Sequence, residues 1–261
     1  MTKVKCQEID IAKLSSITIG FSGAQLESLV NQAAILAVQS EEEEVSDKHL
    51  QYAFSDALMG IKRPLLLEGD EKMLVAFHES GHAIVSFFTP EASPIFQATI
   101  LPRGSALGVV QTLPIREYSV TRAQLLAKMD MAYGGRIAEE IIFGSQNVTT
   151  GCSSDFQQCY SIAKEIVINS GLSSIGFVGL DKDKMGTDMQ ERIDKEIEKV
   201  MKVSCYVSLV NPALKPSQES YERTKKLLLE HEVELRLLAS KLLEFETLSG
   251  AEIEELFQKK E

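Results

Sequence analysis

The chain has 261 residues, of which 44% are hydrophobic and 25% are charged, and its formal net charge is −11. A chain of this size can bury a substantial core in one or two domains. The acidic balance and the lack of a basic cluster with interleaved aromatic residues argue against nucleic acid as a partner. No run of 18 or more apolar residues occurs and the N-terminus does not read as a signal peptide, so we expect no membrane span in the chain as written.

Residues 8–60 have the pattern of a small helical module. Ser22 and Gln25 have the spacing of a capping box, which predicts that a helix begins at this point. The apolar positions that repeat at helical spacing in it are Leu26, Leu29, Val30, Ala33, Ala34 and Ala37. A second helix, predicted to end before Gly60, has its apolar positions at Leu50, Ala53, Phe54, Ala57 and Leu58.

A linker follows at residues 62–70, and a larger unit begins near Glu71 with the motif His78-Glu79-Ser80-Gly81-His82. On a helix, the two histidines four residues apart project from one face. Two neutral imidazoles in that arrangement can hold one Zn²⁺, and Glu79 can reach a water molecule on the metal. The spacing therefore predicts a zinc hydrolase.

The alternative interpretation is a pair of ordinary histidines on an amphipathic helix. The chain has only 4 histidines, and this pair lies inside an apolar stretch that runs from residue 73 to residue 88. A buried charge without a partner is costly, which favours a metal. Gly81 in the helix interior costs about 1 kcal/mol relative to alanine, so we expect another backbone or a substrate to approach it closely.

Residues 97–101 are predicted to form a strand. One hypothesis is that this strand presents an edge on which an extended substrate pairs through backbone hydrogen bonds, which would explain broad sequence tolerance. The alternative is a strand with a purely structural role.

A catalytic zinc site needs a third protein ligand and an open position. No histidine follows His82 before His231, so the third ligand is expected to be a carboxylate or a cysteine. The carboxylate candidates are Glu139, Glu140 and Asp155. Each also has a structural interpretation, because the two glutamates suit a helix surface and Asp155 suits the first turn of a helix that begins near Ser154. The spacing alone leaves this choice open. The 4 cysteines (Cys6, Cys152, Cys159 and Cys205) form no C-x-x-C pair and are interpreted as thiols.

An apolar helical stripe marks the C-terminal region, at Ile193, Ile197, Val200, Met201, Tyr221, Thr224 and Leu228. The stripe is interrupted at residues 202–217, which include Pro212 and Pro216. Two prolines cannot lie in a helix interior without breaking it.

Nucleotide hydrolysis would need a G-x-x-x-x-G-K-[ST] loop to hold phosphates, and none of the 16 glycines falls in one. We therefore do not expect this chain to hydrolyse ATP.

Several ordered blocks resemble the C-terminal part of FtsH-type ATP-dependent zinc metalloproteases, and most closely the mitochondrial i-AAA branch. They are residues 20–26, 77–85, 98–104, 106–108, 134–140, 149–155 and 246–250. The resemblance implies a mainly α fold with a small β element, with a helical AAA lid at residues 8–60 and a zinc metallopeptidase domain at 71–257. It also implies that residues 202–217 are an insertion, since the family helix usually continues through this region.

The same resemblance implies the roles of the site residues. His78, His82 and Asp155 would be the zinc ligands, Glu79 the general base, and Glu140 a supporting or structural carboxylate near the metal. One Zn²⁺ per chain is expected, with ATP used only by full-length members. The implied partners are unfolded polypeptides and full-length subunits in a hexamer, at the mitochondrial inner membrane.

Two functions follow as hypotheses. The first is a zinc metalloendopeptidase that cleaves unfolded or membrane-derived proteins. The second is a catalytically idle module that assembles with full-length subunits and modulates them.

Overall fold

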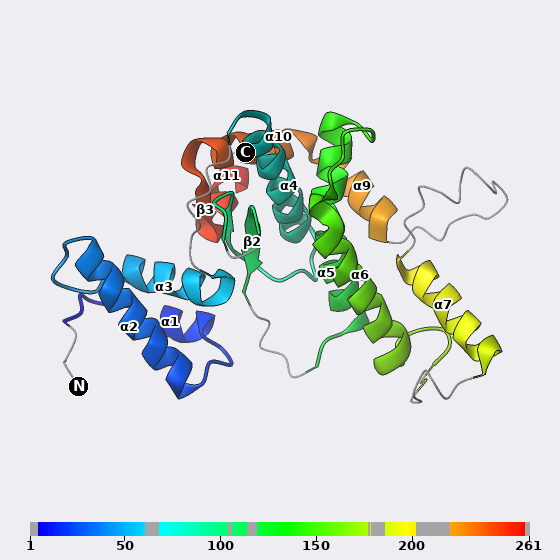
Figure 1. The fold of residues 1–261 in the computed structure, drawn as a ribbon, viewed down its shortest axis with the longest axis horizontal. Helices are drawn as coiled ribbons and strands as arrows, with labels where there is room; N and C mark the ends of the chain where they lie inside the picture. Colours follow the sequence, from blue (N-terminus) through cyan, green and yellow to red (C-terminus); the bar gives the residue numbers. More distant parts are fainter. Residues whose placement is uncertain are drawn as a thin grey trace. The chain divides into compact units, whose positions relative to one another are not determined.

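The computed structural model describes residues 5–60, 68–103, 106–113, 119–176, 178, 186–201 and 220–258. These residues form helices and one small three-stranded sheet (Figure 1), which confirms the mainly α class with a small β element. The chain divides into two compact units. The first unit contains the described residues up to Gly60, the described residues of Leu101–Leu107, and Leu113. The second unit contains the remaining described residues.

The first unit is built from three helices, α1 (Ile11–Ile17), α2 (Gly23–Gln39) and α3 (Asp47–Met59). The predicted capping box is present at the start of α2, where the Ser22 side chain accepts from the Gln25 amide and the Gln25 side chain accepts from the Ser22 amide. Helix α3 ends at Gly60, as predicted, and Gly60 has a φ of 83° that suits glycine.

Fewer residues are buried in the core of this unit than the apolar pattern predicted. The predicted positions that are buried are Leu29, Ala33, Ala37, Leu50, Ala53 and Phe54. Leu26 and Val30 are each 38% exposed and Leu58 is 47% exposed. A contact between two helices covers only part of a wide apolar face, which is why these outer positions stay accessible.

The second unit contains most of the helices. They are α4 (Gly69–Phe88), α5 (Arg122–Phe143), α6 (Ser153–Lys164), α7 (Thr187–Met201), α9 (Ser220–Glu230), α10 (Glu232–Phe245) and α11 (Gly250–Gln258), with a short 3-10 turn at Thr150–Cys152 and a π turn at Glu165–Asn169. Helices α4 and α5 lie side by side (Figure 1), with α10 packed against α4 and α9 mainly against α5.

Glycines allow α4 and α5 to approach with their backbones in contact. A Cβ atom added at Gly81 would lie 2.3 Å from the carbonyl oxygen of Gly134, and one added at Gly134 would lie 2.6 Å from the carbonyl oxygen of Gly81. Real Cβ contacts are never this short, so neither position has room for a side chain. The expectation that another backbone approaches Gly81 is confirmed.

The sheet has the order β2-β1-β3, with β1 (Ile95–Thr99) in the centre and β2 (Val109–Thr112) and β3 (Thr247–Ser249) antiparallel to it. Ala98 pairs with Val110 on one side and with Leu248 on the other. A strand is present, although it spans residues 95–99 rather than the predicted 97–101, and the hypothesis that it presents a free edge is wrong. Strand β1 pairs with β2 along one edge and, along the other edge, with β3 from the distant C-terminal segment.

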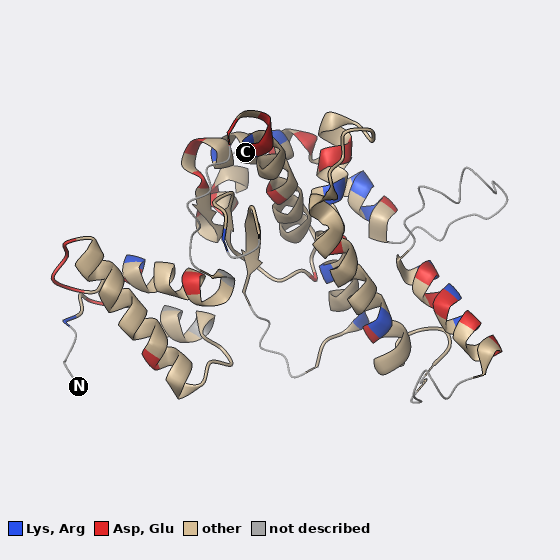
Figure 2. Ribbon diagram, in the orientation of Figure 1, with Lys and Arg blue, Asp and Glu red and all other residues tan. Residues whose placement is uncertain are grey.

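The C-terminal apolar stripe is buried as predicted, with Met201 partly accessible. Acidic and basic residues lie along helix α7 (Figure 2), and one exposed pair, Lys195 and Glu191, lies 3.0 Å apart. The end of α7 and the start of α9 both contact Tyr133, whose hydroxyl donates to the Met201 carbonyl at 2.9 Å and whose ring lies 5.8 Å from the Tyr221 ring. The predicted insertion at residues 202–217 lies outside the described residues.

Among the helices that the structure describes, none combines the length and the apolar character needed to cross a membrane.

Candidate metal centre

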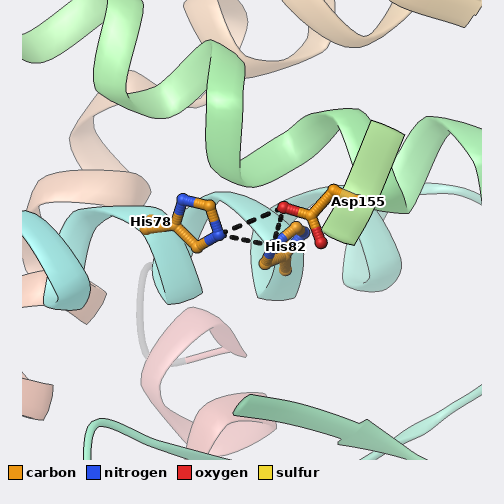
Figure 3. A group of neighbouring side chains, drawn as sticks. All are labelled: His78, His82 and Asp155. Atoms are coloured by element: carbon orange, nitrogen blue, oxygen red, sulfur yellow. Dashed lines mark hydrogen bonds and ion pairs between the residues drawn. The ribbon is translucent and has the colours of Figure 1, made fainter. Parts of the chain in front are cut away.

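Three side chains from two helices converge in the second unit (Figure 3). Helix α4 carries His78 and His82, and the first turn of α6 carries Asp155. The two Nε2 atoms lie 3.1 Å apart, and Oδ2 of Asp155 lies 3.3 Å from the Nε2 of His78 and 3.6 Å from that of His82. Of the three carboxylates that the sequence offered as a third ligand, Asp155 is the one beside both Nε2 atoms.

The other nitrogen of each imidazole is held by an oxygen atom. Nδ1 of His78 donates to Oε1 of Glu139 at 2.7 Å, and Nδ1 of His82 donates to the carbonyl oxygen of Met131 at 2.7 Å. A carboxylate and a carbonyl oxygen only accept hydrogen bonds, so these neighbours favour a proton on each Nδ1. The Gly135 amide also lies 3.3 Å from Nδ1 of His82, but the bond to the Met131 carbonyl is shorter, at 2.7 Å. When a ring is neutral, as a metal ligand must be, it presents the lone pair of its Nε2 atom to the cluster.

These three ligand atoms form an arrangement that suits a cation. Two lone pairs and a carboxylate oxygen face one another, and Oδ2 of Asp155 is buried without a hydrogen bond from any described residue. A tetrahedral zinc ion with bonds of about 2.0–2.2 Å places its ligand atoms about 3.3–3.6 Å apart. The two separations from Asp155, 3.3 and 3.6 Å, lie in that range, and the separation of 3.1 Å between the two Nε2 atoms is slightly shorter than it.

The electrostatics of the metal-free cluster point in the same direction. Burial alone lowers the pKa of His78, but the carboxylates of Asp155, Glu139 and Glu79 outweigh it and raise this pKa to about 10. Burial alone raises the pKa of Asp155, and the two imidazoles outweigh it and hold this pKa well below its ordinary value. The site thus attracts positive charge, whether a proton or a metal ion.

Glu79 is buried next to the cluster, with 5% of its surface exposed. Burial raises the pKa of its carboxyl group, while the two histidines and the backbone amide of Val110, which donates to the carboxylate, act in the opposite direction. Gly108 leaves room for this side chain, since a Cβ atom there would lie 2.8 Å from Oε1 of Glu79. A carboxylate whose pKa is raised is a stronger base than an ordinary glutamate, so this side chain suits a general base beside a metal site.

The carboxylate that supports the histidine pair is Glu139 and not Glu140. Glu139 is fully buried and accepts from His78 and from both the amide and the hydroxyl of Thr149, at 2.8 and 3.1 Å. Glu140 instead accepts from Tyr221 and, at 2.9 Å, from Lys225. Adjacent helix residues point about 100° apart, so only one of Glu139 and Glu140 could face the site. The sequence alone did not indicate which of the two it is.

Gly135 is a site residue that the sequence analysis missed. A Cβ atom at this position would lie 2.5 Å from Cε1 of His78 and 2.6 Å from Nε2 of His82. The available signal was the pair Gly134-Gly135 inside a helix, where each glycine costs about 1 kcal/mol relative to alanine. That cost is explained by two close approaches, one to a backbone and one to the imidazoles.

Cys152 lies three residues before Asp155 but does not belong to the cluster, and its thiol donates to the carbonyl oxygen of Thr149 at 3.3 Å. Among the described residues, Cys152 and Cys159 are free thiols, as expected.

Comparison with known proteins gives two family matches. Residues 65–256 match Peptidase family M41, and residues 8–52 match the AAA+ lid domain. The first match covers well over half of the chain.

Curated relatives match along nearly the whole chain. It is 42% identical to FTSH 11, an ATP-dependent zinc metalloprotease of Arabidopsis thaliana described as chloroplastic/mitochondrial, over 99% of the chain and 30% of that protein. It is 40% identical to the ATP-dependent zinc metalloprotease YME1L of Drosophila melanogaster, over 97% of the chain and 33% of that protein. It is 38% identical to the ATP-dependent zinc metalloprotease FtsH of Rickettsia felis, over 98% of the chain and 40% of that protein. The chain thus spans between 30% and 40% of the length of these relatives.

Proposed function

This chain belongs to Peptidase family M41, and on that premise we propose that it is a zinc metalloendopeptidase that hydrolyses peptide bonds of unfolded or membrane-derived polypeptides. The observation that carries the proposal is the convergence of His78, His82 and Asp155 beside the buried carboxylate of Glu79. In this assignment His78, His82 and Asp155 hold one zinc ion, and Glu79 is the general base.

Bound zinc supplies Lewis-acid chemistry, since it polarises a carbonyl group and makes water a nucleophile near neutral pH. Glu79 accepts the proton of the attacking water and delivers it to the leaving amine. The amide of Val110 orients this carboxylate, and burial raises the pKa of the Glu79 carboxyl group, which strengthens it as a base. Glu139 and the Met131 carbonyl fix both imidazole rings with Nε2 facing the ion.

The substrate is proposed to pair with strand β2, and not with residues 97–101 as the sequence suggested. The described part of the sheet has β2 at one end, paired on one side with β1. The amide of Val110 donates to Glu79 rather than to β1, so its carbonyl oxygen points to the open side of the strand too. An extended polypeptide that pairs along this edge would lie next to Glu79, and main-chain pairing would tolerate many sequences.

We also propose the domain organisation and the cellular setting of the full-length protein. Residues 8–60 would form an AAA lid and residues 71–257 the peptidase domain, with residues 202–217 as an insertion. The names of the relatives support ATP-dependent proteolysis by a longer protein, and the description of FTSH 11 as chloroplastic/mitochondrial supports a place in mitochondria. We assign it to a hexamer at the inner membrane. ATP hydrolysis is not assigned to this chain, which has no phosphate-binding loop motif.

Cleavage of a short unstructured peptide, which requires no unfolding, tests this function. The zinc-loaded chain is expected to cleave the peptide, and a chelator should abolish the activity. The matched variant Glu79→Gln should keep its zinc and lose the activity, because it removes the base without removing a ligand. Full zinc occupancy without cleavage would favour the idle assembly module, and cleavage by Glu79→Gln would refute the proposed base.

A further inference from the structure

Thr149 forms hydrogen bonds in two directions, to helix α5 and to the turn that follows it along the chain. Its backbone amide and its hydroxyl both donate to Oε2 of Glu139 on α5, at 2.8 and 3.1 Å. Its hydroxyl also accepts from the amide of Gly151 at 3.3 Å, and its carbonyl oxygen accepts from the thiol of Cys152 at 3.3 Å. All of these residues belong to the same compact unit as the metal centre.

The hydroxyl of Thr149 uses both its proton and a lone pair. A threonine hydroxyl offers one proton and two lone pairs. The carboxylate of Glu139 only accepts and so takes the proton, whereas the amide of Gly151 only donates and so takes a lone pair. Thr149 is thereby the N-cap of the 3-10 turn Thr150–Cys152, with an extended backbone at φ −98° and ψ 171°. One hydroxyl thus satisfies a buried carboxylate and also caps this turn.

The turn that Thr149 caps passes directly into the helix of the third ligand. Helix α6 begins at Ser153, whose amide donates to the carbonyl oxygen of Thr150, and Asp155 lies in the first turn of α6. Oδ2 of Asp155 is buried without a hydrogen bond from any described residue. The place of this oxygen beside the imidazoles therefore depends on the backbone that carries it, and Thr149 holds the start of that backbone against α5.

We propose that Thr149 is a positioning residue, whose hydroxyl fixes the start of α6 and so keeps the carboxylate of Asp155 within reach of the same ion as the two histidines. The inference rests on the proposed function, because it explains how the third ligand of the proposed zinc site is held. Zinc affinity should then depend on a hydroxyl that is not itself a ligand.

The experiment uses variants of the complete chain. Thr149→Val removes the hydroxyl with little change in shape and keeps the backbone amide, whereas Thr149→Ser keeps the hydroxyl. The matched control is Thr150→Val, which makes the same substitution at the neighbouring, exposed threonine. The measurements are zinc affinity by competition with a chelator, peptide cleavage, the melting temperature, and hydrogen exchange of the Gly151 and Ser153 amides in the metal-free chain.

Thr149→Val is expected to lower zinc affinity by about tenfold, the lower end of what partners outside the ligand set contribute, because the backbone amide still donates to Glu139. Thr149→Ser and Thr150→Val should each stay within about threefold. In a chain that already carries Asp155→Asn, Thr149→Val should cost less than about threefold, because the residue that it positions no longer supplies a carboxylate. Exchange of the Gly151 and Ser153 amides should accelerate in Thr149→Val and not in the other two single variants.

The inference is overturned if Thr149→Val binds zinc within twofold of the unmodified chain, even where the melting temperature falls, since a purely structural threonine would give that result. An equal loss in Thr149→Ser would overturn it too, because the hydroxyl would then not be the cause. If the unmodified chain binds zinc and cleaves no peptide, the proposed function fails while the affinities still test Thr149. If it binds no zinc, unchanged exchange of the Gly151 and Ser153 amides in Thr149→Val would overturn the positioning role.

Discussion

Glu139 and His78 are joined by a hydrogen bond of 2.7 Å between Oε1 and Nδ1, although the two residues lie on different helices and 61 positions apart. This bond directs the opposite nitrogen of the imidazole toward Asp155. The same carboxylate accepts two hydrogen bonds from Thr149, so it also connects the histidine helix to the segment that leads into α6. Glu139 therefore helps to position both His78 and the segment that leads to Asp155.

Substitution of Glu139 should weaken the metal site more than substitution of its neighbour. Glu139→Gln leaves one of the donors that face it without an acceptor, and we expect zinc affinity to fall by about 10-fold to 100-fold. Competition with a chelator of known affinity measures this change. The control is Glu140→Gln, which weakens the contacts with Tyr221 and Lys225 and should leave zinc affinity within twofold. Equal effects of the two variants would contradict the assignment.

Zinc affinity should rise steeply with pH. The pKa of His78 is raised to about 10 in the metal-free site, so zinc must displace a proton from it at any lower pH. Asp155, whose pKa is lowered, is already ionised and adds no further dependence. Affinity should therefore increase by about tenfold per pH unit between pH 7 and 9. Isothermal titrations across this range provide the test, and a flat profile would show that no proton is displaced.

Titration of His78 should make the metal-free chain less stable as the pH rises, whereas zinc affinity increases. His78 has a higher pKa in the folded state than its ordinary 6.5, so its protonated form stabilises the fold. That contribution is complete below pH 6.5 and is lost as the pH rises through about 10. Urea unfolding in the presence of a chelator should show a smaller free energy of unfolding at pH 9 than at pH 7. The variant His78→Ala, which lacks the titrating group, should reduce this difference.

The two neighbouring glycines of α5 should respond differently to alanine. Gly135→Ala places a methyl group against both imidazoles, and we expect zinc affinity to fall at least tenfold. Gly134→Ala meets the Gly81 backbone instead, and should lower the free energy of unfolding by about 1–3 kcal/mol. Gly23→Ala is the control, because nothing lies within 4 Å of its Cβ position. Zinc titration and urea unfolding distinguish the two effects, and an unchanged Gly135→Ala would contradict the packing.

Removal of residues 202–217 should leave the peptidase unit folded. Both flanking helices contact Tyr133, so the two ends of the segment are already held close together. Shortening a connection between ends that lie close together costs little loop entropy. Thermal unfolding and zinc binding of the deletion variant should match those of the complete chain within a few degrees and within twofold. Loss of zinc binding on deletion would show that the segment is part of the fold.

The sequence predicted those features that depend on local spacing. The positions of His78 and His82 follow from helical periodicity, and the capping box of α2 follows from a three-residue interval. The choice of Asp155 came from family resemblance, since spacing alone left it level with two glutamates. The central place of β1 could not be predicted, because it depends on pairing with β3 from the far end of the chain. The same holds for the contact between Glu139 and His78, which depends on how α4 and α5 cross.

The central claim is that His78, His82 and Asp155 hold a zinc ion, and X-ray absorption at the zinc edge tests it most directly. The zinc-loaded chain should show one ion per chain, with only nitrogen and oxygen ligands at about 2.0–2.2 Å, two of them imidazoles. Asp155→Asn should lose at least tenfold in affinity. A sulfur ligand at about 2.3 Å, which Cys152 could supply, would contradict the account, and so would a chain that binds no zinc.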